Sequence, residues 1–250
     1  MYLQKLKKIV IIPAYNEEKR IAEIINNIKS IDKDLKIAVI DDGSSDNTAL
    51  NAISAGAVVI KLPFNIGYGS ALQTGYKYAL ENGFDIVVQM DGDGQHDPKY
   101  IPEMINTLIK NNVDVLIGSR FKVKTSYKTT FARRIGIILF SKIVSLIIKK
   151  RVTDATSGYQ VIRATVLPFL VSESFPIDYP DADLLIMLNY EGFKIEEFPM
   201  KMHSDPKSKS MHKGFLKNIY YIFKMLMSIF LLVISIKFFK SYSKQQIIDR

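Results

Sequence analysis

The chain has 250 residues, no cysteine and a formal net charge of +9 at pH 7. This length suits one α/β domain with a C-terminal extension, and the lack of cysteine excludes a disulfide framework and thiolate chemistry. The N-terminus carries basic residues before an apolar run of only five residues, 9–13, which is not typical of a signal peptide. We therefore expect the protein to stay in the cytoplasm.

The charge is unevenly placed along the chain. Residues 1–114 carry 12 Lys and Arg against 15 Asp and Glu, whereas residues 115–250 carry 22 against 10. Two tracts, 115–153 and 206–248, contain no acid at all. Because an ordinary solvated surface carries both positive and negative charges, these tracts predict an anionic partner, either nucleic acid or anionic lipid. Long aliphatic runs rather than stacking aromatics interrupt them, which argues against nucleic acid.

Short apolar runs alternate with amphipathic stretches through the first half of the chain. The runs predict strands at residues 8–13, 36–40, 58–62, 86–90 and 113–117. Helical spacing predicts apolar stripes of Ile21, Ile24, Ile25 and Ile28; of Leu72, Tyr76, Ala79 and Leu80; and of Ile101, Met104, Ile105, Leu108 and Ile109. Asp46 or Ser45 would cap a further helix that Gly56 closes. This alternation predicts a mostly parallel sheet with right-handed crossovers, whose ligand crevice lies beyond the carboxyl ends of the strands.

The run that ends at Met90 stops abruptly at the loop sequence DGDGQ. If this loop starts extended, Asp91, Asp93 and Gln95 point to the same side, and two carboxylates with one amide oxygen suit Mg²⁺ or Mn²⁺. The two glycines leave room for a bulky anion at the backbone. A calcium loop is excluded, because its sixth and twelfth positions lack the required glycine and glutamate. A solvated acidic turn is the open alternative to a metal–diphosphate site.

Polar residues directly follow all five predicted strands. Because the carboxyl ends of parallel strands share one edge, we expect these residues to form one site, although each alone is explained as a cap, a turn or a solvated loop. They are Tyr15, Asn16, Glu17, Asp41, Asp42, Asn65, Gly67, Asp91, Asp93 and Arg120.

The motifs at these strand ends carry a family resemblance. They read IPAYNEE at residues 12–18, VIDDGSSDNT at 39–48, NIG at 65–67, DGDGQ at 91–95 and GSRF at 118–121. In this order they resemble family 2 glycosyltransferases of the GT-A fold, and among these the dolichyl- and polyprenyl-phosphate sugar synthases. The resemblance covers residues 8 to about 163. It implies a GT-A-type, mostly parallel sheet flanked by helices, a nucleotide-sugar donor, a divalent metal (Mg²⁺ or Mn²⁺) and inversion at the sugar carbon.

The resemblance also implies roles for individual residues. The nucleotide-sugar set is Pro13, Tyr15, Asn16, Glu17, Asp41, Asp42, Asn65 and Gly67. The metal set is Asp91, Asp93 and Gln95, and its two aspartates count as catalytic because a bound cation stabilises the charge on a leaving nucleoside diphosphate.

An acceptor phosphate is anionic at neutral pH and needs cations to position it rather than a general base. Arg120, Arg133 and Arg134 are the candidates, with a simple basic surface as the alternative. Asp181 and Asp183 stand where relatives keep an acid at a helix start, and either is a base for a hydroxyl acceptor or a structural charge. We include Asp181 among the catalytic candidates.

Three further segments shape the family assignment. DATSGY, residues 154–159, resembles a segment that borders the acceptor. The family's Arg-x-x-Gly-x-Ser loop over the diphosphate has its counterpart at residues 203–212, which contain no arginine. Lys207, Lys209 or His212 would supply the charge there, without the bidentate fork of a guanidinium. The chain has no tryptophan, so it lacks the Gln-x-x-Arg-Trp motif of processive synthases.

Two apolar segments bear on the membrane. Residues 135–148 are flanked by cations and would span about 21 Å as a helix, short of a hydrocarbon core of roughly 30 Å. A helix over about 132–150 that lies on an anionic leaflet is favoured over a core helix. The run 219–239 contains two lysines, which favours an interfacial or homo-oligomer contact helix, then a single span, then a core helix. We expect a GT-A domain over 1–213 and a helical extension over 214–250.

These expectations combine into one predicted activity. The protein would move a hexose from a UDP- or GDP-sugar to a polyprenyl (dolichyl or undecaprenyl) phosphate at the cytoplasmic face of the membrane, with metal dependence and inversion. Two alternatives stay open. One is a glycosyltransferase acting on a saccharide hydroxyl in cell-surface polysaccharide synthesis, and the other is a non-catalytic, membrane-bound scaffold.

Overall fold

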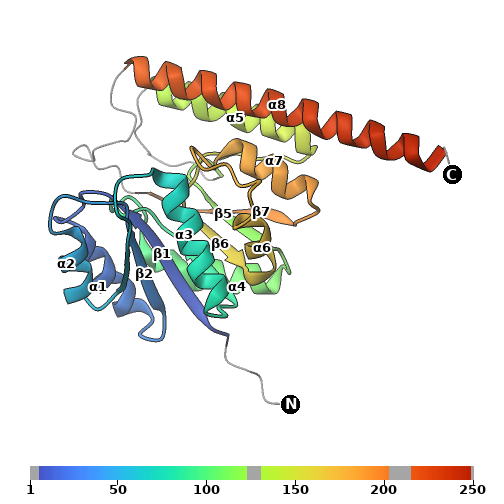
Figure 1. The fold of residues 1–250 in the computed structure, drawn as a ribbon. Coiled ribbons are helices and arrows are strands. Elements are labelled where there is room, and N and C mark those ends of the chain that lie inside the picture. Colours follow the sequence, from blue (N-terminus) through green and yellow to red (C-terminus); the bar gives the residue numbers. More distant parts are fainter. Residues whose placement is uncertain (1–5, 123–130, 203–214, 249–250) are drawn as a thin grey trace, which may run out of the picture.

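The computed structural model describes residues 6–122, 131–202 and 215–248, and the side chains of residues 6–122, 134–202 and 220–236 (Figure 1). The strands are β1 (Lys8–Ala14), β2 (Lys36–Asp41), β3 (Val58–Lys61), β4 (Ile86–Gln89), β5 (Val115–Ser119), β6 (Gln160–Arg163) and β7 (Ile195–Pro199). The helices are α1 (Ile21–Ile31), α2 (Thr48–Ser54), α3 (Tyr68–Glu81), α4 (Ile101–Lys110), α5 (Phe131–Ile148), α6 (Leu167–Leu170), α7 (Ala182–Tyr190) and α8 (Phe215–Ile248).

The strands of the described residues form one seven-stranded sheet in the order β3-β2-β1-β4-β6-β5-β7. The pairs β1–β2, β2–β3, β1–β4 and β5–β7 are parallel. β6 runs antiparallel to both of its neighbours. The mostly parallel sheet is therefore confirmed. The carboxyl ends of six strands and the amino end of β6 meet at one edge, and β4 lies in the middle of the order.

Helices cover both faces of the sheet. Ile9 and Ile11 of β1 pack into the core layer under α3, α6, α7 and α8, whereas Val10 and Ile12 pack into the layer under α1, α2 and α4. All four side chains are buried. Strands buried on both faces need continuous apolar sequence, which is why β1 and β4 were visible as uninterrupted runs.

Some predicted boundaries and faces differ from the structure. β5 begins at Val115, two residues later than expected, because Val113 still closes α4 through a hydrogen bond from its N–H to Leu108 O at 3.2 Å. Leu80 and Ile109, expected in the apolar stripes, are 38% and 41% exposed. β6 and β7 were not predicted, because they are short and carry polar residues such as Gln160.

α5 and α8 lie side by side above α7, and α8 runs on past the body of the domain (Figure 1). Met225 and Ile229 of α8 are buried in the same core as α3 and α7. Other apolar side chains of both helices stay exposed, among them Ile135, Ile138, Leu146, Tyr220, Phe223, Phe230 and Leu231. Within the described residues, no helix combines the length and apolar character that crossing a membrane requires.

Candidate active site

The acidic loop follows β4 at the carboxyl edge of the sheet. Asp91 and Asp93 lie close enough to influence each other, since burial and then the neighbouring Asp91 carboxylate raise the pKa of Asp93. Gln95 donates its backbone N–H to Asp93 Oδ1 at 3.0 Å and its side-chain amide to Oδ2. The loop is a turn with Gly94 at φ 78°, not the extended stretch assumed from the sequence. Nevertheless the loop keeps the three side chains together.

This arrangement fits a divalent cation with an incomplete protein ligand set. Two carboxylates that repel each other in a half-buried place gain from a positive charge between them. The described residues contain no cluster of three or more His, Cys, Asp and Glu side chains that could hold a metal. Mg²⁺ and Mn²⁺ commonly take one or two carboxylates and complete their shells with substrate phosphates and water. The donor set therefore suits an ion that arrives with a diphosphate.

The Asp91 carboxylate is held from several directions. Tyr68 Oη donates to Asp91 Oδ1 at 2.8 Å. His96 Nδ1 accepts the Asp91 backbone N–H at 3.0 Å, and its Nε2 lies 3.6 Å from Asp91 Oδ2. A Cβ at Gly158 would come within 2.9 Å of both carboxylate oxygens. Sequence reasoning missed Tyr68 and His96, and it had Gly158 only as part of the DATSGY segment. The one available signal was the place of Tyr68 directly after the strand-end motif NIG.

A buried chain of hydrogen bonds continues beneath Tyr68. Tyr76 Oη donates to Gln89 Oε1, and Gln89 Nε2 donates to Tyr68 Oη at 3.2 Å. Gln89 lies in the central strand β4 and is 3% exposed. A buried amide keeps its place only when its polar atoms are hydrogen-bonded. These hydrogen bonds therefore fix the Tyr68 phenol, which in turn orients Asp91.

The loops after β1 and β2 bind each other. Asn16, at φ 55°, donates its N–H to Ser44 Oγ at 2.9 Å, and its side-chain oxygen accepts the Ser45 N–H at 2.9 Å. Glu17 donates its N–H to Thr48 Oγ1 at 2.8 Å. Asn16 and Glu17, which we expected to touch a nucleotide, thus also hold the loops after β1 and β2 together.

Asp42 and Asp41 play different parts. Both are buried. The Asp42 carboxylate accepts the N–H groups of Ile66 and Gly67 at 2.8 and 3.0 Å, which holds Gly67 at φ 104°, a conformation that needs glycine. Asp41 Oδ1 accepts the Ser44 N–H at 3.1 Å, whereas Asp41 Oδ2 has no hydrogen-bond partner within the described residues. A buried oxygen without a partner is costly unless a ligand supplies one.

The remaining residues of the expected nucleotide set differ in access. Tyr15 is 48% exposed and Asn65 is also exposed. Pro13 is buried in β1, in register with Ile40 of β2. Tyr15 and Asn65 are thus the exposed members of the set.

Arg120 follows β5 and is 4% exposed. Its Nε and Nη2 donate to the two carboxylate oxygens of Asp154 at 2.7 Å each, and Nη2 also donates to Thr156 Oγ1 at 3.0 Å. Asp154 is fully buried. We expected Arg120 to bind an acceptor phosphate, but its guanidinium is instead committed to a buried bidentate ion pair. This pair fixes the segment before β6 to the loop after β5.

Asp181 and Asp183 begin α7 and are not equivalent. Asp183 is 3% exposed and accepts hydrogen bonds from the Leu184 N–H at 2.8 Å and from Ser228 Oγ at 2.6 Å. Asp181 is half-buried and accepts one from Tyr221 Oη at 2.7 Å. Burial raises the pKa of Asp181 to about 6, against the hydrogen bond from Tyr221, which lowers it. The charges of Asp183, Asp91 and Arg120 also act on Asp181, so it lies within electrostatic range of the acidic loop.

Comparison with known proteins now identifies the family. A sequence profile described as glycosyl transferase family 2 matches residues 9–169. The chain belongs to glycosyl transferase family 2. It is therefore a glycosyltransferase, as the strand-end motifs implied.

The similar sequences of family 2 include several lipid-phosphate sugar transferases. A UDP-N-acetylglucosamine–dolichyl-phosphate N-acetylglucosaminyltransferase of Methanococcus voltae is 32% identical over 211 residues, covering 77% of this chain and 84% of its own. A dolichol-phosphate mannosyltransferase of Pyrococcus furiosus is 32% identical, covering 88% of this chain and 64% of its own. An undecaprenyl-phosphate mannosyltransferase of Micrococcus luteus is 28% identical, covering 65% and 68%.

Solved structures confirm the GT-A fold of this family 2 member. Glucosyl-3-phosphoglycerate synthase of Mycobacterium tuberculosis, in complex with Mn²⁺ and uridine-diphosphate-glucose, superposes with a TM-score of 0.65. The two chains are 20% identical, and the match covers 89% of this chain and 79% of the other. At this identity the similarity bears on the fold alone.

For four of the candidate cations, the described contacts do not test the predicted role in binding phosphate. Arg134 is exposed on the first turn of α5. The side chain of Arg133 lies outside the described residues, as do Lys207 and Lys209 with the whole segment 203–212. Their assignment to the acceptor phosphate and to the diphosphate stays a prediction.

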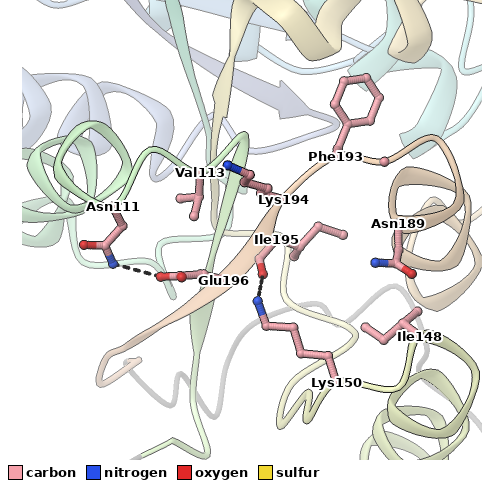
Figure 2. Close-up of a pocket in the computed structure, with 10 residues that line it drawn as sticks. Asn111, Val113, Ile148, Lys150, Asn189, Phe193, Lys194, Ile195 and Glu196 are labelled. Atoms are coloured by element: carbon pink, nitrogen blue, oxygen red, sulfur yellow. Dashed lines mark hydrogen bonds between the residues drawn. The ribbon is translucent and has the colours of Figure 1, made fainter.

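A cavity of about 340 Å³ lies away from this site, at the amino ends of β5 and β7 (Figure 2). Asn111 Nδ2 donates to Glu196 Oε2 at 2.8 Å there, and Lys150 Nζ donates to Ile195 O at 2.6 Å. These polar groups bond one another, and the cavity opens at the end of the sheet opposite the acidic loop. We assign it no part in the transfer.

Proposed function

We propose that this glycosyltransferase moves a hexose from a UDP- or GDP-sugar to a polyprenyl phosphate at a membrane surface. The observation that carries the proposal is the pairing of Asp91 with Asp93 at the middle of the carboxyl edge, beside Asp181 and below two helices with exposed apolar side chains. A relative that acts on dolichyl phosphate at 32% identity supports the choice of acceptor.

The site divides into two halves about the acidic loop. We call the loops after β1, β2 and β3 the donor half. We call the loop after β5, the segment before β6 and the start of α7 the acceptor half. β4 separates the two groups of strands in the sheet, so a ligand on the acidic loop would face both halves.

In the donor half, the exposed ring of Tyr15 would stack on the base. Asp41 Oδ2, which has no hydrogen-bond partner in the described part of the chain, would accept a ring N–H. Uracil and guanine both carry such an N–H, whereas the cytosine of a CDP-sugar does not, which favours UDP- and GDP-sugars. Asp42 would act indirectly by holding the Asn65–Gly67 loop.

At the acidic loop, Asp91, Asp93 and Gln95 would hold Mg²⁺ or Mn²⁺. When bound, the cation neutralises charge that develops on the leaving nucleoside diphosphate. Tyr68 would keep the Asp91 carboxylate in place through its hydrogen bond. Desolvation and the neighbouring Asp91 carboxylate raise the phenol pKa of the part-buried Tyr68 well above the ordinary value, so it stays protonated and remains a donor.

In the acceptor half, one oxygen of the lipid phosphate would attack the sugar carbon as the bond to the diphosphate breaks, which inverts that carbon. A phosphate monoester has a second pKa of about 6, so part of the acceptor still carries a proton at neutral pH. The phosphate dianion needs no base, and Asp181 would take the proton from the fraction of acceptor that still carries one. Asp183 is held at both oxygens and keeps a structural role.

The acceptor experiment compares lipid phosphate with free sugars. Purified protein with Mn²⁺ is given UDP-, GDP- and CDP-sugars, and transfer to a polyprenyl phosphate is measured beside transfer to saccharide hydroxyls. Transfer to saccharides alone would establish the second candidate function, which the base-like setting of Asp181 favours. Thermal shifts with UDP, GDP and CDP report the base preference, because a ligand of the native state raises its apparent stability.

The proposed membrane surface consists of the exposed apolar residues of α5 and α8 with the neighbouring cations of the acid-free tracts. Leu146 is 81% exposed and Phe230 is 59% exposed. Leu146→Asp with Phe230→Asp should abolish flotation with anionic vesicles. Leu50→Asp is the matched control, because Leu50 is also exposed but lies on α2 in the other helix layer. Equal loss in the control, or no loss in the double variant, would contradict this surface.

A further inference from the structure

The C-terminal helix reaches into the acceptor half with two hydroxyl groups. Tyr221 Oη bonds Asp181 at 2.7 Å and Ser228 Oγ bonds Asp183 at 2.6 Å. The two residues are seven apart, so they share one face of α8, and their carboxylate partners are two apart at the start of α7. α8 therefore contacts both Asp181 and Asp183, and it also exposes Tyr220 and other apolar side chains.

The Tyr221 ring is fixed by its neighbours. It packs edge-on against Phe140 of α5, with ring centroids 5.8 Å apart, and against Tyr179, at 5.2 Å. One turn along α8, Lys224 Nζ lies 2.5 Å from Asp178 Oδ2 and ties the helix to the segment before α7. Aromatic packing on two sides leaves the phenol little freedom, so its hydroxyl meets Asp181 in a defined place.

Asp181 is the acid on which this contact matters for chemistry. Asp183 is buried and its two oxygens are bonded, which suits a helix-start charge. Asp181 is half-buried, and the charged or titratable groups that act on it include Tyr221 from α8, Asp183 from α7, Asp91 from the acidic loop, Arg120 from the loop after β5 and Tyr68 from α3. Of these, Tyr221 donates a hydrogen bond to its carboxylate.

We propose that Tyr221 is a positioning residue of the transfer site, supplied by the C-terminal helix, which holds the Asp181 carboxylate ready to take the acceptor proton. This inference rests on the proposed function. Tyr221 forms no bond to substrate in this scheme. It keeps Asp181 in one orientation and favours its charged form, because a donor hydrogen bond stabilises a carboxylate over the protonated acid.

Tyr221→Phe tests the inference, because it removes the hydroxyl and keeps the ring that packs on Phe140 and Tyr179. Transfer falls as pH drops through the pKa of Asp181, since only the carboxylate accepts a proton. Loss of the hydrogen bond raises that pKa, so the acid limb of kcat should move to higher pH by about 0.4 to 1 unit. The KM for the donor should not change.

Ser228→Ala is the matched control. It removes a hydroxyl on the same face of α8, the one that bonds the other acid, Asp183. This variant should therefore lower Tm without moving the acid limb of kcat. The acceptor phosphate titrates in the same pH range as Asp181. All variants are therefore assayed with one acceptor, and the test is the difference between their acid limbs. An acid limb in Tyr221→Phe that superposes on the unchanged protein, or an equal shift in Ser228→Ala, would overturn the inference.

A second measurement separates this inference from the proposed function. Carboxyl carbons of labelled aspartates are titrated by NMR in the full-length protein, with Asp181→Asn to assign the signal. A higher Asp181 midpoint in Tyr221→Phe is expected. If the unchanged protein transfers no sugar to lipid phosphate, the proposed function fails. An Asp181 midpoint that Tyr221→Phe leaves unchanged defeats the positioning role by itself.

Discussion

The donor half and the acceptor half of the site are held together by different kinds of contact. In the donor half, neighbouring loops bond through side chain to backbone contacts, as Asp42 does with Gly67. In the acceptor half, side chains from remote elements hold the acids, as Ser228 of α8 does for Asp183. The donor half is thus organised by contacts between adjacent strand-end loops, whereas the acceptor half depends on how helices and strands pack. Substitutions should accordingly change ligand affinity in the first and stability or pH response in the second.

The largest effect is expected from breaking the ion pair of the acceptor half. Arg120→Ala leaves the buried Asp154 carboxylate without its partner, and loss of one member of such a pair costs about 3 to 5 kcal/mol of unfolding free energy. Ser44→Ala removes one hydrogen bond in the donor half and should cost about 1 kcal/mol. Chemical denaturation measures both. Equal losses would remove the contrast between the halves.

Asp93→Asn should lower transfer at least about 100-fold, because it removes one of the two carboxylates offered to the cation. The variant should unfold at the same denaturant concentration as the parent or higher, since it loses a charge that burial disfavours. Asp97→Asn is the control in the same segment and should keep its activity, as asparagine also caps a helix. Normal turnover by Asp93→Asn would contradict the proposed metal site.

Tyr15→Ala should raise the KM for the donor by about 5- to 100-fold with little change in kcat, because stacking on a base is worth about 1 to 3 kcal/mol. Tyr15→Phe keeps the ring and should behave as the parent. Tm should not change in either variant, since the side chain is 48% exposed. A loss of kcat at unchanged KM would place Tyr15 outside the donor half.

The smallest effect concerns pH. The pKa of Asp181 is about 6 in the folded protein, above its ordinary value of 3.8. The folded state therefore binds a proton more tightly than the unfolded state does, so this group's stabilisation is complete below about pH 4 and is lost as pH rises through 6. The fall in Tm between pH 4.5 and 7 should be smaller in Asp181→Asn than in the parent. An equal fall in both proteins would contradict the assignment.

The donor half and the acidic loop could be predicted from the sequence because their signals are local motifs. β1, β2 and β4 are apolar runs followed within a few residues by polar motifs, and the rule that parallel strands end at one edge brought Tyr15, Asp41 and Asp91 together. What the motifs could not show is which polar atoms already have partners. The roles of Asp42 and Asn16 as loop holders follow from hydrogen bonds across 24 to 29 positions of the chain.

The acceptor half could be predicted only in part, because its contacts join distant segments. Asp154 was placed near the acceptor by a family motif, yet its pairing with Arg120 depends on the antiparallel strand β6, which is short and begins with a glutamine. Tyr221 and Asp181 are 40 positions apart. The available signal was two hydroxyl residues, Tyr221 and Ser228, spaced seven apart in an apolar helix.

The reversed direction of β6 has a practical consequence for engineering this enzyme. The amino end of β6 lies at the site. The residues that precede this strand, from Asp154 to Gly158, therefore contribute to the site, whereas for the other strands the residues that follow the strand do so. A library aimed at new acceptors should therefore vary the approach to this strand and leave its exit alone. Asp154 and Gly158 are the positions in that approach to keep fixed, since Asp154 is the ion-pair partner of the buried Arg120 and even alanine at 158 would crowd the Asp91 carboxylate.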